Sequence, residues 1–221
     1  MLVAAHQPNF LPNLGFFYKM QRADFFVVIS NIQFEKQEGW QQRHKIPGPN
    51  NDIWLTVPVL GSQNQKIKEV RINNLVNWRK KHKKTIELIY GRTKEKETLG
   101  ELLEIYNKPW ERLVDLNFAL ISYFKELLSI KTPLILDEEV FGEKHDLLIN
   151  ICKKYKADGY LSGAGAKHYM SEEYFLEIEK NSISHFFVDN NLTALYPYSI
   201  IHYLLNDGKE EVLKLIKHSL V

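Results

Sequence analysis

The sequence predicts an α/β fold: a mostly parallel sheet with flanking helices and a helical middle segment. Two continuous apolar runs, residues 2–5 and 25–30, lie on either side of a segment with helical periodicity at 14–23. Parallel strands need such a crossover, and strands with both faces covered are apolar throughout. A third apolar run ends at Ser162 and breaks into small residues at 163–166, which indicates another strand that ends in a turn.

Apolar spacing places the remaining elements in order along the chain. Further strands are expected at 54–59, 69–72, 133–136 and 183–188, and helices at 78–90, 99–106, 109–128, 144–155, 172–180, 199–206 and 209–218. Residues 31–49 are polar and aromatic and are expected to form a loop rich in hydrogen-bond donors. We expect one domain over 1–221, with a mainly helical insertion or subdomain at about 75–130.

Composition and charge exclude several classes of protein. With 44% hydrophobic and 25% charged residues, the chain is neither disordered nor collagen-like. Lys and Arg number 29 against 27 Asp and Glu, a formal charge of +2, so nucleic acid is not an expected partner. The basic cluster Arg79–Lys84 is expected to be a solvated helix face, with Trp78 and His82 turned inward. Cys152 is the single cysteine, which excludes an internal disulfide.

The sequence also gives expectations about location and metals. No run reaches the roughly 20 apolar residues that cross a bilayer, and the first residues do not have the pattern of a signal peptide. We therefore expect no membrane span and a cytoplasmic location. The eight histidines are scattered without ligand spacing, so no metal site is expected.

Polar side chains follow the first predicted strand. His6, Gln7 and Asn9 stand where ligands bind in open parallel sheets, outside the carboxyl ends of the strands. His6 is the candidate general base or polarising donor because imidazole titrates near neutral pH. Gln7 and Asn9 supply amide donors and acceptors to the same catalytic group. The alternative interpretation is that His6 only caps the strand end.

A set of binding residues is expected after the second strand. Asn31, Gln33, Lys36, Trp40 and Arg43 combine aromatic surface for stacking with cations suited to a phosphate or carboxylate. The alternative is a solvated basic loop with one tryptophan packed inward.

The turn after the third apolar run is a second candidate for substrate binding. Ser162 and Gly163, with Lys167 and Tyr169 further on, complete the predicted set. Small side chains let backbone N–H groups approach a phosphate. Neither the P-loop nor the dinucleotide glycine motif is present, so a plain tight turn is the alternative.

Motifs over nearly the whole chain resemble the WbqC-like family. They include His6-Gln7-Pro8-Asn9-Phe10-Leu11-Pro12, Trp40-Gln41-Gln42-Arg43, Tyr160-Leu161-Ser162-Gly163 with Tyr169, and Leu205-Asn206-Asp207-Gly208. The resemblance implies action on nucleotide-linked sugars in bacterial or archaeal surface-polysaccharide pathways. Two positions depart from the family pattern: Asn13 replaces the usual Trp and His202 the usual Asp. In outline the fold is expected to be Rossmann-like or nucleotidyltransferase-like.

The expected function is therefore transfer of an acyl or aminoacyl group to a nucleotide-linked amino sugar in O-antigen-type polysaccharide biosynthesis. Two alternatives stay open: a nucleotidyl or adenylyl transferase that uses ATP and Mg²⁺, and a non-catalytic subunit that binds a nucleotide sugar. The expected partners are a small-molecule nucleotide sugar and an activated donor, with homo-oligomer formation as a further option. The sequence identifies no cofactor.

Overall fold

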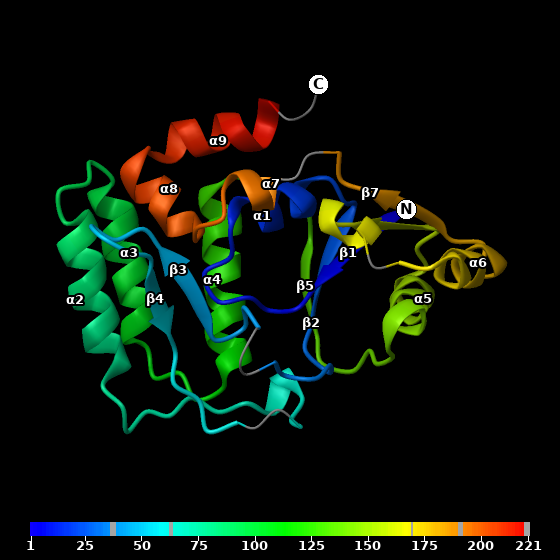
Figure 1. Ribbon diagram of the computed structural model, residues 1–221, viewed down its shortest axis with the longest axis horizontal. Helices are drawn as coiled ribbons and strands as arrows, with labels where there is room; N and C mark the ends of the chain where they lie inside the picture. Colours follow the sequence, from blue (N-terminus) through cyan, green and yellow to red (C-terminus); the bar gives the residue numbers. More distant parts are fainter. Residues whose placement is uncertain (36–38, 62–63, 169, 190–191, 219–221) are drawn as a thin grey trace.

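A five-stranded, all-parallel sheet forms the centre of the protein (Figure 1). The computed structural model describes residues 1–35, 39–61, 64–168, 170–189 and 192–218. The strand order is β5-β2-β1-β6-β7, with β1 Leu2–His6, β2 Phe25–Ile29, β5 Leu134–Asp137, β6 Gly159–Ser162 and β7 Ser184–Phe187. Counted along the chain, this is the Rossmann-like order 3-2-1-4-5. The predicted α/β fold is confirmed.

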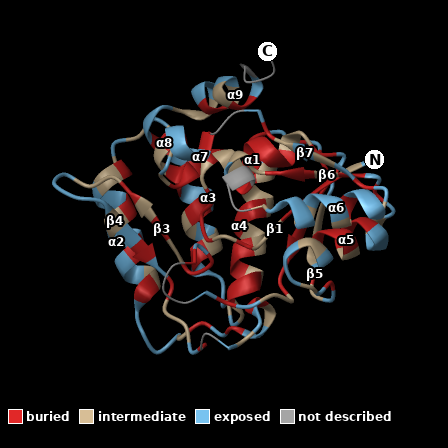
Figure 2. Cartoon of the chain, turned by 45° about the vertical axis from the view of Figure 1, so that its right-hand side comes forward, coloured by how far each residue is buried: buried red, intermediate tan, exposed pale blue. Residues whose placement is uncertain are grey.

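Helices cover both faces of the sheet. Residues of β1 and β2 alternate between two apolar clusters, because successive side chains of a strand point to opposite faces. Ala4 and Phe26 pack in the cluster that includes α1 (Leu14–Gln21) and α4 (Leu113–Leu127). Val3 and Val27 pack in the cluster that includes α5 (Lys144–Tyr155) and α6 (Glu172–Lys180). Figure 2 shows how much of α4 is buried by this arrangement.

The middle segment is helical and lies to one side of the sheet in Figure 1. It contains α2 (Trp78–Tyr90), α3 (Lys96–Asn107) and α4. On α2, Trp78 and His82 are buried whereas the four lysines at 80, 81, 83 and 84 are exposed, as the sequence predicts. The chain ends with α7 (Leu192–Leu195), α8 (Ile200–Asn206) and α9 (Lys209–His218). No helix in the described residues is long and apolar enough to cross a membrane.

Two parts of the chain differ from the sequence-based expectation. The predicted loop at 31–49 contains β3 (Arg43–Ile46), which pairs antiparallel with β4 (Ile53–Thr56). The turn 47–50 contains two prolines and one glycine, which explains the reversal between these strands. The predicted strand at 69–72 is also wrong: its first residue, Glu69, ends the 3-10 helix η1 (Ile67–Glu69), and Arg71 and Ile72 form only isolated bridges. Glu69 accepts a hydrogen bond from the Lys66 N–H at 3.2 Å, which stabilises this turn.

Acidification is expected to destabilise the fold because buried imidazoles take up protons only on unfolding. His82 is 6% exposed, its Nε2 lies 3.1 Å from the Thr56 carbonyl oxygen, and desolvation lowers its pKa to about 4. This pKa lies below the unfolded value of about 6.5, so the stabilisation is present above that pH and is lost as the pH falls toward 4. Between about pH 7 and pH 5, the free energy of unfolding should fall by about 2 kcal/mol per such histidine.

Urea denaturation at the two pH values measures this loss. The variant His82→Gln keeps a donor for the Thr56 carbonyl and removes the titrating group, so its stability should depend less on pH. An equal pH dependence in the variant and the wild type would contradict the expectation.

Candidate functional site

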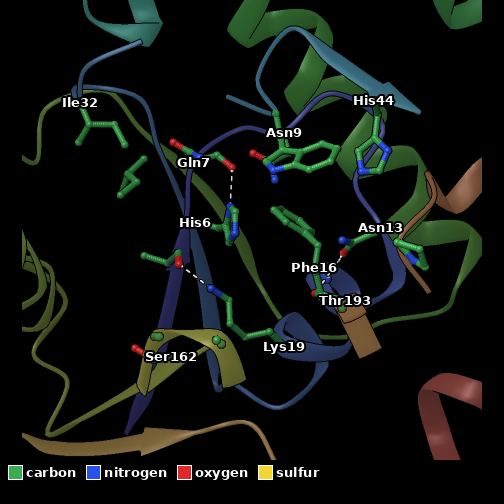
Figure 3. A pocket seen from close by; sticks show the side chains of 18 of the residues that line it. His6, Gln7, Asn9, Asn13, Phe16, Lys19, Ile32, His44, Ser162 and Thr193 are labelled. Carbon is green, nitrogen blue, oxygen red and sulfur yellow. Dashed lines mark hydrogen bonds between the residues drawn. The ribbon is translucent and has the colours of Figure 1, made fainter. Parts of the chain in front are cut away.

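A pocket of about 830 Å³ opens at the carboxyl edge of the sheet, where β1 and β6 part (Figure 3). The pairing of β1 with β6 covers only Leu2 and Val3, whereas its pairing with β2 continues to His6. The helices that follow β1 and β6 pack on opposite faces, so this is the point where the strand order reverses. Open α/β sheets bind ligands at such a point.

His6 is the last residue of β1 and lines the pocket. Its Nδ1 lies 3.0 Å from the Gln7 carbonyl oxygen, which can only accept, so Nδ1 carries the proton of the neutral ring. Burial, together with the charge of nearby Lys19, lowers the pKa of His6 to about 3. The ring is therefore neutral near pH 7, and its Nε2 is a hydrogen-bond acceptor.

Amide side chains hold the loop that follows β1. Gln41 donates from Nε2 to Oε1 of Gln7 at 2.8 Å. Asn117 on α4 donates from Nδ2 to the carbonyl oxygens of Pro8 and Gln41, each at 2.7 Å. The buried Oδ1 of Asn9 has no hydrogen-bond partner among the described residues, and Asn9 lines the pocket. Gln7 and Asn9 therefore lie where a ligand can contact them.

Lys19 lines the same pocket, and the sequence analysis missed it. Its side chain is 6% exposed, its Nζ donates to the Ala5 carbonyl oxygen at 2.8 Å, and burial lowers its pKa to about 7. The available signal is its spacing, because Lys19 stands one helical turn after Phe16, which also lines the pocket. None of the described lining residues is Asp or Glu.

The turn after β6 forms another wall of the pocket. Ser162 and Gly163 line it, and the Ser162 Oγ lies 2.8 Å from Nε2 of His185 on β7. A Cβ built on Gly163 or Gly165 meets no atom within 4 Å, so the backbone here is open to a ligand. A second cavity of about 290 Å³ shares Gly15 and both glycines with the first. The 3-10 helix η2 (Ala164–His168) follows the turn, but the Lys167 side chain and Tyr169 lie outside the described residues.

An aromatic strip runs along the rim of the pocket. Trp40 lines the pocket, and its ring centroid lies 4.7 Å from that of His44 and 5.8 Å from that of Trp54. Both tryptophans are exposed, at 37% and 45%. The Arg43 guanidinium carbon lies 4.7 Å from the centroid of Trp54, and Arg43 is not among the described lining residues.

The structure thus brings together six of the predicted site residues and separates others. His6, Gln7, Asn9, Trp40, Ser162 and Gly163 line one pocket. Asn31 instead donates to the Glu139 carbonyl oxygen at 2.9 Å, and Gln33 is exposed and bridges to Lys66. Lys36 lies outside the described residues. No group of three His, Cys, Asp or Glu that can hold a metal ion occurs in the described part of the chain.

Comparison with known proteins identifies the family. The model of the WbqC-like protein family matches residues 7–212. The chain belongs to this family. It is also 31% identical over 182 residues to the uncharacterized protein Rv1507c of Mycobacterium tuberculosis, which covers 80% of this chain and 78% of the relative. No solved structure gives a significant match.

The two positions that the sequence analysis expects to depart from the family pattern lie in different places. Asn13 caps α1, where its Oδ1 accepts from the Phe16 N–H at 3.2 Å, and it lines the pocket. His202 on α8 is not among the described lining residues; its Nδ1 lies 3.1 Å from the Tyr90 hydroxyl. Of the two positions, Asn13 is therefore the one that shapes the pocket wall.

The tautomer and charge of His6 can be measured directly. In ¹⁵N-labelled protein, the imidazole of His6 should stay neutral with its proton on Nδ1 from about pH 5 to pH 8, because burial and Lys19 oppose protonation. In urea-unfolded protein the same residue should titrate near about pH 6.5. Titration near that value in the folded protein would show that His6 is solvated and unaffected by Lys19.

Proposed function

We propose that this member of the WbqC-like family transfers an acyl or aminoacyl group to the amine of a nucleotide-linked amino sugar, within surface-polysaccharide biosynthesis of the O-antigen type. The observation that carries the proposal is the placement of His6, a neutral imidazole with its Nε2 free of a proton, in the pocket where the strand order reverses. Family membership supports the sugar pathway.

In this mechanism the sugar amine attacks the activated carbonyl of the donor. As the C–N bond forms, His6 accepts the amine proton at Nε2, and the leaving group departs with its electron pair. Gln7 already accepts from Gln41 through Oε1, so its Nε2 donors are left for the carbonyl oxygen under attack. The Oδ1 of Asn9 accepts a hydrogen bond from the sugar.

The walls of the pocket suit the rest of such a substrate. Its volume of about 830 Å³ falls in the range of small-molecule sites. Trp40 offers a flat ring for stacking, and the open backbone at Gly163 and Gly165, next to Ser162, holds the diphosphate. The described lining residues contain no carboxylate that would repel an anion.

The test is an assay of purified protein with UDP- or dTDP-linked amino sugars and acyl-CoA or aminoacyl donors, read by mass spectrometry of the N-acylated sugar. His6→Ala should lower kcat at least about 100-fold, because it removes the proton acceptor. The control His145→Ala should leave the rate unchanged, since His145 is not among the described lining residues.

Three results would contradict the proposal. Full activity of the His6→Ala variant would remove His6 from the chemistry. Pyrophosphate release from ATP and Mg²⁺ without an acylated product would indicate nucleotidyl or adenylyl transfer instead. Binding of nucleotide sugars without turnover of any donor would indicate a non-catalytic binding subunit.

A further inference from the structure

Lys19 lies at the place where β1 and β6 part. The pairing of these strands ends at Val3 and Tyr160, and the carbonyl oxygen of Ala5 beyond it accepts the hydrogen bond of the Lys19 Nζ at 2.8 Å. Figure 3 shows the side chain of Lys19 extending from α1 toward this carbonyl. The Nζ also lies 5.5 Å from the ring centroid of Phe26. The amine is therefore held on the floor of the pocket by one hydrogen bond, beside apolar surface.

The described residues supply no carboxylate to this amine. Burying a cation costs free energy unless it is paired. Lys45, the other lysine among the described lining residues, is paired with Asp52 at 2.7 Å. Asp189, which follows β7, accepts from the Tyr18 hydroxyl of α1 at 2.6 Å, and its Oδ1 lies 3.7 Å from Nε of Arg22. A buried amine without a carboxylate partner is a site that an anionic ligand can complete, because the anion favours the protonated form of the amine.

We propose that Lys19 is the anion-binding residue of this pocket, and that its ammonium holds an oxygen of a phosphate or carboxylate group of the ligand. An ammonium donates three hydrogen bonds, and the Ala5 carbonyl uses one of them. The inference rests on the proposed function for the identity of the whole substrate: the phosphate belongs to the nucleotide-linked sugar, the carboxylate to an acidic sugar or donor.

Binding of an anion at Lys19 also changes His6. Burial lowers the pKa of His6, and the positive charge of Lys19 lowers it as well. A bound anion offsets that charge, so the pKa of His6 rises toward the range in which a general base works best. An anion at Lys19 therefore removes one of the two causes that lower the pKa of His6, the base of the proposed reaction.

The test uses small anions and no turnover, so that its failure is distinct from failure of the proposed reaction. Titration calorimetry measures the affinity of the full-length protein for inorganic pyrophosphate and, separately, for acetate. Lys19→Met should weaken binding of the preferred anion about tenfold or more, because it removes a charge-assisted hydrogen bond. The matched control Lys45→Met, whose charge Asp52 already offsets, should change affinity less than about threefold.

The comparison of pyrophosphate with acetate shows which charged group of the ligand Lys19 binds. Loss confined to pyrophosphate indicates a phosphate group, and loss confined to acetate indicates a carboxylate. Equal losses in the Lys19→Met and Lys45→Met variants, or absence of binding of both anions to the wild type, would overturn the inference.

A measurement on the wild type keeps the inference testable if Lys19→Met fails to fold. The bound anion should slow acetylation of Lys19 by acetic anhydride at least about fivefold, relative to the exposed lysines of α2, as quantified by peptide mass spectrometry. Equal labelling of Lys19 with and without the anion would overturn the inference.

Discussion

The parting of β1 and β6 is the constraint on which the candidate site depends. Their parallel pairing stops at Val3 and Tyr160, while β2 supports β1 as far as His6. One edge of β1 is therefore rigid at His6 and the other is open. Because the following helices pack on opposite faces, no crossover fills the opening, and the ends of both strands form its walls. A sheet in which β1 and β6 paired to their ends would leave less room for a ligand here.

The helical middle segment supports this opening from the other side. Asn117 on α4 binds two carbonyl oxygens, one in the loop after β1 and one in the segment before β3. On α2, His82 meets the carbonyl oxygen of Thr56 at the end of β4. Buried polar groups that are hydrogen-bonded in this way restrict the chain to one arrangement more strongly than apolar packing does. The middle helices thus help to position Gln7 and Asn9, although most residues of these helices lie away from the pocket.

Much of the fold follows from local patterns, and so does part of the site. Continuous apolar residues at 25–29 indicate a buried strand, and helical periodicity marks the segments 78–90 and 144–155. The rule that ligands bind at the carboxyl ends of strands predicts His6 and Ser162 as site residues, and both line the pocket. Arg43 was expected in the pocket because its segment was interpreted as a loop. In β3, His44 and Lys45 line the pocket, whereas the Arg43 guanidinium packs against the ring of Trp54. Lys19 was missed because lysine on a short helix is ordinarily exposed.

The missed residue shows why sequence pattern alone is insufficient at a site. Sequence patterns reflect the interactions that stabilise a fold, whereas Lys19 destabilises it. Burying an amine with one hydrogen bond costs free energy that an apolar side chain in the same place would not cost. Local rules are broken at functional positions more often than elsewhere. His6 belongs to the same exception, because burial and the charge of Lys19 both lower its pKa and oppose its protonation. A neutral ligand would leave the Lys19 amine without a charged partner, whereas an anion would pair with it. If Lys19 has the role proposed above, the pocket therefore favours an anionic ligand over a neutral one of the same shape.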